Sequence, residues 1–521
     1  MKIQFSRKKA MRAILAWSLA LALAAPVPMS AVAFAATAQT QTTDTETTQA
    51  DGTQAQPPQG GPDGQPPMGP PPDGEPPMGP PPDGSTPPGP PPDGQMMPLG
   101  GPNGQQDGSQ GQPPQGGPGQ PSTKSASEFD ATKIVDAETE TIDSGTFEAT
   151  ETDANAVLVR NGGTLTLTGA ELSKTGDSSS ADASNFSGQN AVFLAADSTA
   201  LLENVTLTSD ADGANAVFAT GSSAKVTAKN LTIQTKNNSS RGLDATYDGT
   251  IVAQDVDITT EGEHCAALAT DRGEGTVTVD GAKIATSGAG SPNVYSTGAI
   301  TLKNATGAAT GSEIAVVEGK NSIVLENVDL TGSKDQGIML YQSFSGDAGV
   351  GEASFRAKDS TLRNDSDGPM FFVTNTQAVA SLQNVALVQS GDVLVKVAAG
   401  RWGKAGANGG DFTMTAKDQT LTGQVLADSI SSVALDLGEG AVYEGAFNAD
   451  NTAQRAAITL AQTAHWSLTA DAYVSSISDE ATGYANIASN GHNIYYDKDA
   501  ATALGGRTYS LPGGGKLLPR N

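Results

Sequence analysis

The chain has 521 residues and a net charge of −27 at pH 7, so we expect more than one structural region and no basic surface for nucleic-acid phosphates. Charged residues make up 17% and aromatic residues 5%, while glycine occurs 61 times and proline 30 times, which disfavours long helices. The single cysteine, Cys265, excludes an intrachain disulfide, and only three histidines are present, which leaves no His/Cys zinc motif.

The first 36 residues have the three parts of a secretory signal. Five basic residues lie within the first twelve, an apolar run covers 13–25, and small residues at 31–35 provide cleavage sites. The apolar run is shorter than the roughly 20 residues that span a bilayer. We therefore expect residues 1–36 to be removed on export, which changes the net charge from −27 to −27 − 5 = −32 and leaves no transmembrane segment. No lipidation cysteine or C-terminal sorting tail is present, so we expect any surface attachment to be non-covalent.

Residues 37–126 are predicted to be a disordered spacer, first rich in Thr and Gln and then in Pro and Gly. Residues 57–121 contain 24 prolines and 17 glycines, a composition that cannot bury enough apolar area to offset ordering. Between residues 64 and 94 glycine recurs at every fifth position, whereas a collagen triple helix needs every third. The segment therefore reads as a semi-extended linker, with recognition by a proline-binding partner as the alternative.

From residue 127 the chain is built from an internal repeat. A turn-forming residue, a small residue, a polar residue and then Leu or Ile recur at steps of 23 to 35 residues, with a degenerate copy ending at Gly307. Around these phrases, stretches such as Thr276–Val279 alternate polar and apolar residues, as half-buried strands do. The copies begin at Gly169, Asn204, Asn230, Asp255, Gly281, Asn304, Asn327, Asp359 and Asn384.

A unit of about 25 residues with two or three short strands and Gly/Asn/Asp turns predicts one coil of a right-handed parallel β-helix. It is too short for a propeller blade and lacks the patterns of helical and leucine-rich repeats. We expect an all-β solenoid over 127–455, with further coils and a cap over 456–521. Asn204, Asn230, Asn327 and Asn384 should form a turn ladder, because Asn tolerates the left-handed backbone. One inward aliphatic ladder should contain Leu172, Leu207, Ile233, Ile258, Ile284, Leu330, Leu362 and Leu387.

These phased phrases resemble the pectin-lyase-like superfamily of right-handed parallel β-helix proteins. More narrowly, the chain resembles secreted bacterial surface proteins described as adhesin-like or carbohydrate-binding, whose ends are similar to His465-Trp466-Ser467-Leu468, 472–474 and 490–496 here. The resemblance covers roughly 390 residues. It implies a fold but no single activity, because the superfamily holds lyases, hydrolases, tailspikes and adhesins.

An enzymatic role has weak support in the sequence. Inverting glycoside hydrolases need two carboxyl groups about 6.5–9.5 Å apart, and no Asp-Asp dipeptide or Gly-His-Gly occurs. His264 could provide an acid–base group, although a solvated loop explains it equally simply. Lyase-type catalysis would need acids near an arginine such as Arg241 or Arg272, without a signature that matches. A polysaccharide lyase or hydrolase therefore remains an alternative rather than the leading prediction, and Cys265 is read as a small buried residue.

Calcium without catalysis is a further hypothesis. Asp210, Asp212 and Asn215 provide oxygen ligands in a stretch that begins like an EF-hand loop, but the twelfth position is Gly221 instead of Glu. The alternative is a turn that uses Asp and Gly for its backbone. No other cofactor is expected.

Carbohydrate binding is predicted at two insertions and one protrusion. The longer repeat steps place insertions near 173–189 and near 341–353, the second containing Tyr341 and Phe344. About six coils, or ~29 Å, should separate them, so we expect them to flank an extended groove and not to share a pocket. Trp402, next to Arg401 in a glycine-rich protrusion, is the best candidate for stacking on an anionic sugar, with capping of an apolar edge as the alternative.

The leading hypothesis is an exported, cell-surface or secreted β-helix that binds polysaccharide or a cell-surface glycan without catalysis. The first alternative is a polysaccharide lyase or hydrolase whose site spans several coils. The second is a purely structural surface rod. An enzyme predicts a cluster of acids and arginines in a groove, a binder predicts aromatic and polar groups without that cluster, and a rod predicts neither.

Overall fold

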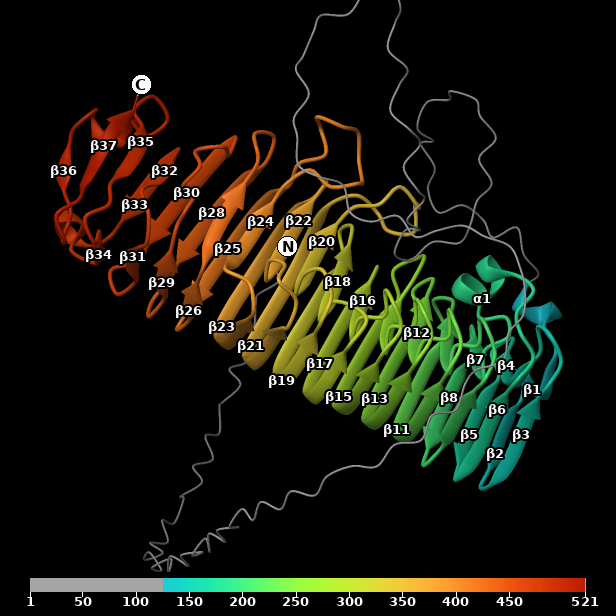
Figure 1. Ribbon diagram of the computed structural model, residues 1–521. Coiled ribbons are helices and arrows are strands. Elements are labelled where there is room, and N and C mark those ends of the chain that lie inside the picture. Colours follow the sequence, from blue (N-terminus) through green and yellow to red (C-terminus); the bar gives the residue numbers. More distant parts are fainter. Residues whose placement is uncertain (1–124, 521) are drawn as a thin grey trace, which may run out of the picture. The chain divides into compact units, whose positions relative to one another are not determined.

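The computed structural model describes residues 125–520, and these form a parallel β-solenoid of about 16 turns (Figure 1). The predicted secretory signal and almost all of the predicted spacer lie outside the described residues. The all-β parallel architecture and the coil of about 25 residues predicted from the repeat are confirmed.

One side of the solenoid is a twelve-stranded parallel sheet of three- to six-residue strands, here called the short-strand sheet. In spatial order it consists of β1 (Ala131–Asp136), β4 (Asn155–Arg160), β7 (Phe193–Ala196), β10 (Val217–Thr220), β12 (Leu243–Thr246), β14 (Leu268–Thr270), β16 (Val294–Ser296), β18 (Ala315–Glu318), β20 (Ile338–Tyr341), β22 (Phe371–Thr374), β24 (Val393–Val397) and β27 (Gln424–Ala427).

A second parallel sheet, here called the long-strand sheet, is built from the repeat phrases themselves. Its first coils contribute two separate strands each, in the pairs β2 (Thr139–Ile142) and β3 (Gly145–Ala149), β5 (Thr164–Thr168) and β6 (Ala170–Lys174), and β8 (Thr199–Glu203) and β9 (Thr206–Ser209). These two rows merge at β11 (Lys225–Thr235), which pairs with both β8 and β9. The sheet continues through β13 (Thr250–Thr260), β15 (Thr276–Thr286), β17 (Ala299–Ala309), β19 (Ser322–Gly332), β21 (Glu352–Asn364), β23 (Gln377–Gln389), β25 (Asp411–Lys417), β28 (Ser432–Leu437), β30 (Arg455–Leu460) and β33 (Ser476–Asp479).

The C-terminal coils add two four-stranded sheets. One contains β26 (Thr420–Thr422), β29 (Val442–Gly445), β31 (His465–Leu468) and β34 (Ile487–Ala488), all parallel. The other contains β32 (Ala472–Val474), β35 (Ile494–Asp497), β37 (Lys516–Arg520) and β36 (Tyr509–Ser510). In the second sheet β36 runs antiparallel to β37, which ends the parallel stacking.

Helices are few and short in the described chain. The 3-10 helices are η1 (Ala126–Glu128), η2 (Thr482–Tyr484) and η3 (Thr502–Leu504). The α-helix α1 (Ala181–Ser187) lies in the first predicted insertion, capped by the Ser180 side chain and by Gly188 in the left-handed conformation. A Cβ at Gly188 would lie 2.7 Å from Phe218, so this close contact with the sheet also needs glycine.

The turn phrase explains why the long strands bend. Along β11 the alternation of buried and exposed side chains breaks at Lys229 and Asn230, which are both exposed, and then resumes at Leu231. Asn230 has φ +52°, a backbone conformation that Asn and Gly adopt more readily than other residues. The predicted turn residues Asn204, Asn327 and Asn384 also have positive φ, so the predicted turn ladder is confirmed.

The predicted aliphatic ladder is confirmed in its register. Each member pairs with its counterpart in the next coil, from Leu172 opposite Leu207 through Leu362 opposite Leu387. All of its members are buried except Leu387, which is half-buried. Gly307 occupies its place between Ile284 and Leu330, and the Asn293 side chain lies in the space that a larger residue would need.

Candidate functional site

The four residues predicted to bind carbohydrate come together in one aromatic cluster. The Trp402 ring lies 5.7 Å from the Tyr341 ring and 6.3 Å from the Phe344 ring, measured between centroids. The Arg401 guanidinium carbon lies 4.8 Å from the centroid of the Trp402 ring, within the range of a cation–π contact. Tyr341 ends β20, Phe344 lies in the segment after it, and the other two lie in the loop between β24 and β25.

The aromatic cluster has a buried base and an exposed rim. Tyr341 is 1% exposed, whereas Phe344 is 68% exposed and Trp402 is half-buried. The Asn408 amide donates to the carbonyls of Gly400 and Trp402, both at 2.8 Å, and so holds the loop in shape. The Trp402 indole Nε1 is buried without an acceptor among the described residues. Trp402 packs against a buried cluster that includes Ala266, Ala269 and Tyr295, as the edge-capping alternative expects, and the exposed rim consists mainly of the Phe344 ring and the Arg401 side chain.

A buried hydroxyl–carboxylate network supports the base of this cluster. The Tyr341 hydroxyl donates to Glu318 at 2.8 Å, and the Tyr295 hydroxyl donates to the same oxygen at 2.6 Å. The Ser343 hydroxyl donates to the other oxygen of Glu318. Burial raises the pKa of Glu318 above its ordinary value, and these donors act in the opposite direction. The network fixes where the segment that carries Phe344 leaves the sheet.

The three candidate calcium ligands do not converge. The Asp210 carboxylate pairs with Lys236 at 3.1 Å, and the Asp212 carboxylate accepts from the backbone N–H of Asn238 at 3.0 Å. Asn215 is fully buried, and its side-chain oxygen accepts from the backbone N–H of Arg241 at 2.8 Å. Within residues 125–520 no group of three or more His, Cys, Asp or Glu side chains is placed to hold a metal ion. The EF-hand-like stretch is therefore a turn whose side chains link neighbouring coils.

A set of buried charges lies on the outer face of the short-strand sheet, one or two coils beyond α1. Arg241 is 4% exposed, and its guanidinium lies 3.0 Å from Asp271 and 3.6 Å from Asp244. Both carboxyl oxygens of Asp244 are buried without a hydrogen-bond partner in the described chain. Burial raises the pKa of Asp244 to about 6 and raises the pKa of Asp271 well above its ordinary value.

This buried set contains the residue types that an enzyme would use, but it is not in a groove. The cavity beside it, lined by Arg241, His264 and Tyr295 among others, measures about 20 Å³, which has room for about one water molecule. His264 lies in a turn, as the loop interpretation expects, but it is half-buried, and burial lowers its pKa. The neighbouring Cys265 is fully buried and accepts a contact from the Ser240 N–H at 3.0 Å. Burial raises the pKa of its thiol to about 12, as expected of a structural cysteine.

Arg272 bridges the two insertions, although six strand steps separate the coils from which they leave the sheet. The Arg272 guanidinium lies 3.7 Å from the centroid of the Phe186 ring in α1 and 2.6 Å from the carboxylate of Asp347 in the second insertion. In the sheet order, β14 is three strands from β7 and three from β20, so each insertion reaches roughly 14 Å along the axis. The predicted spacing of six coils between the two insertions agrees with the sheet order, but each insertion also folds across the face of the sheet.

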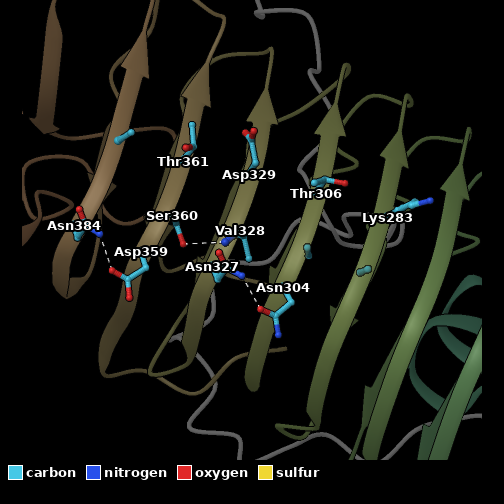
Figure 2. Close-up of a pocket in the computed structure, with 13 residues that line it drawn as sticks. Lys283, Asn304, Thr306, Asn327, Val328, Asp329, Asp359, Ser360, Thr361 and Asn384 are labelled. Carbon is cyan, nitrogen blue, oxygen red and sulfur yellow. Dashed lines mark hydrogen bonds between the residues drawn. The ribbon is translucent and has the colours of Figure 1, made fainter. Parts of the chain in front are cut away.

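A broad hollow on the long-strand sheet was not predicted from the sequence. It measures about 620 Å³ and crosses five consecutive strands of the long-strand sheet, from β15 to β23. Figure 2 shows two rows of side chains along it, with Lys283, Thr306, Asp329 and Thr361 in one row and Asn304, Asn327, Asp359 and Asn384 in the other. The second row consists of the turn residues of the repeat phrase, so the sequence contained the residues of this row. The row lines a groove only because the strands bend at these residues.

No family model, curated protein or solved structure matches this chain. Membership of the pectin-lyase-like superfamily therefore stays a prediction. In the described part of the chain no helix is both long and apolar enough to cross a membrane.

Proposed function

We propose that this protein is an exported cell-surface or secreted β-solenoid that binds an anionic extracellular polysaccharide through its aromatic cluster, without catalysis. One observation carries the proposal. Tyr341, Phe344, Trp402 and Arg401 come from two separate loops, and they form an aromatic platform with a cation at 4.8 Å from the Trp402 ring. The predicted secretory signal and spacer support display outside the cell, and the predicted acidity of the mature chain suits solubility there.

The platform has the two elements that an acidic sugar needs. An aromatic face provides apolar contact for the C–H groups of a sugar ring, and a guanidinium can pair with a carboxylate or sulfate on it. Arg401 and Lys404 are both exposed in the same loop. In a chain of net charge −27, this local pair of cations is the feature that favours an anionic ligand over a neutral one.

Affinity electrophoresis tests the proposal. The full chain is run through native gels that contain pectic, cell-wall or host acidic polysaccharides, and retardation without loss of polymer is the expected result. Trp402→Ala should weaken retardation about tenfold, a loss equivalent to about 1.4 kcal/mol. Tyr473→Ala is the matched control, because Tyr473 is also half-buried but stacks on Tyr495 far along the chain.

The other outcomes separate the alternatives. Clearing of polymer behind the band would contradict the proposal and support a lyase or hydrolase. Absence of retardation in every gel, together with self-association, would support the structural rod. Equal loss in the Trp402 and Tyr473 variants would remove the aromatic cluster from the explanation.

A further inference from the structure

The groove on the long-strand sheet is separate from the aromatic cluster. The cluster is carried by loops that follow β20 and β24 of the short-strand sheet, whereas the groove is lined by side chains from the middle of β15, β17, β19, β21 and β23. The rows in Figure 2 repeat once per coil, because strands of successive coils pair residue by residue, as Lys283, Thr306 and Asp329 do. A surface of this kind offers a polar group at every step of about 4.8 Å along the solenoid.

The turn ladder has a gap at the centre of this groove. The Asn327 amide donates to the Asn304 side-chain oxygen at 2.7 Å, and the Asn384 amide donates to the Asp359 carboxylate at 2.7 Å. No such bond joins Asn327 to Asp359 in the described chain, since an aspartate has no proton to donate. The Asn327 side-chain oxygen and the second oxygen of the Asp359 carboxylate, whose first oxygen accepts from Asn384, therefore stand on consecutive coils of the groove, and both residues are exposed (Figure 2). A ligand that donates hydrogen bonds would satisfy both.

The charges in the groove favour an uncharged donor. The lining contains one cation, Lys283, and two carboxylates, Asp329 and Asp359. Lys358 lies 3.6 Å from Asp359 and offsets part of its charge. The remaining polar lining consists of amides and hydroxyls, and no aromatic residue lines the groove. A hydroxyl-rich ligand held by hydrogen bonds matches this lining better than a sugar that stacks.

We propose that this groove is a second binding site, for an uncharged linear polysaccharide that lies along the solenoid axis with about one sugar per coil. A β-1,4-linked chain is extended and has a sugar repeat close to the strand spacing, so successive sugars meet successive coils of the groove. Hydroxyls at the centre donate to Asn327 and Asp359, and Thr306 contacts the neighbouring sugar. This site differs in ligand and location from the aromatic cluster, so either one can fail without the other.

Oligosaccharide length provides the sharpest test. The full chain is titrated calorimetrically with β-1,4-linked oligomers of glucose, xylose and N-acetylglucosamine, with α-1,4-linked glucose oligomers as the mismatched control. Affinity should rise with length and level off at about five sugars, since the groove crosses five strands. Binding should persist in the presence of a chelator, because hydroxyls and not a bridging cation satisfy the two acceptors.

Two matched variants locate the site. Thr306→Arg should fill the groove and reduce affinity for the five-sugar oligomer at least tenfold. Thr232→Arg is the control, because Thr232 is an equally exposed threonine at the same place in the coil on β11, outside the groove. Both variants are melted to show that they fold. The proposal is overturned if no β-1,4-linked oligomer binds with this length dependence, if chelator abolishes binding, or if the two variants lose affinity equally; retained binding in Trp402→Ala is expected.

Discussion

On the short-strand sheet the outward side chains of β12 and β14 are almost completely buried, whereas on the long-strand sheet those of β17 and β19 face solvent. Asp244 and Asp271 are at most 5% exposed, although both belong to the outer face. Thr306 and Asp329, at outward positions of the other sheet, are exposed. In the coils of β12 and β14 themselves, Asp257 on β13 and Lys283 on β15 are exposed as well, so the coil itself does not decide which face is closed.

The difference arises from the two insertions. α1 and the segment after Tyr341 fold over the short-strand sheet and meet at Arg272, while the long-strand sheet receives no insertion between β11 and β23. The buried face consequently contains charges that must be paired, and the open face contains polar ladders that water can satisfy. This contrast teaches that insertions turn one face of a regular solenoid into an interior and leave the other open to solvent.

Removal of the central cation should have the largest effect on the closed face. Arg241→Ala leaves the Asp271 and Asp244 carboxyls buried without their counter-charge, and we expect a loss of about 3–5 kcal/mol in the free energy of unfolding. Chemical denaturation followed by circular dichroism measures it. Lys236→Ala is the control, because its pair with Asp210 is more than half exposed and should contribute less than about 1 kcal/mol. Similar losses in the two variants would contradict the description of a sealed charge set.

Removal of Arg272, which bridges the two insertions, should reduce stability less and mainly in the insertions. Arg272→Ala removes the contact with Phe186 and leaves the Asp347 carboxylate, which is 2% exposed, without its partner. We expect a loss of about 2–3 kcal/mol. Hydrogen exchange should accelerate in 181–187 and 342–349 but not in β17 and β19. Lys303→Ala, which breaks the exposed pair with Glu326 on the long-strand sheet, should leave both regions unchanged.

The sequence predicted the regular solenoid better than the candidate sites on its surface. The aliphatic ladder followed from one residue per repeat, and even the degenerate copy at Gly307 falls into register. The aromatic cluster could be proposed from residue types, but its assembly depends on two loops far apart in the chain. The buried charges around Arg241 could not be predicted, because no motif in the neighbouring sequence indicates that α1 covers them. The groove was missed because a ladder of turn residues becomes a hollow only once the strands bend.

Lower pH should stabilise the closed face through protonation of Asp244. Burial raises its pKa in the folded state to about 6, whereas in the unfolded chain an aspartate titrates near ~3.9. Between these values the folded state binds more protons, so this group adds stability as the pH falls from about 7 to about 4. We expect wild type to gain about 2–3 kcal/mol relative to Asp244→Asn over this range, measured by denaturation at each pH. A difference that does not depend on pH would show that the carboxyl is not sealed.

Completing the turn ladder should have the smallest effect on stability and act only on the open face. Asp359→Asn keeps a residue that tolerates φ +49°. The new side-chain amide can donate to the Asn327 oxygen, so one exposed hydrogen bond should form and add about 0.5 kcal/mol at most. The same change occupies the Asn327 oxygen and replaces the second Asp359 oxygen with a donor, so affinity for an uncharged oligosaccharide in the groove should fall while thermal stability rises slightly. Asp255→Asn is the control, because Asp255 occupies the equivalent turn on β13 outside the groove. Lower stability in Asp359→Asn would mean that the added hydrogen bond does not form. Unchanged oligosaccharide affinity would mean that the gap in the ladder has no part in binding.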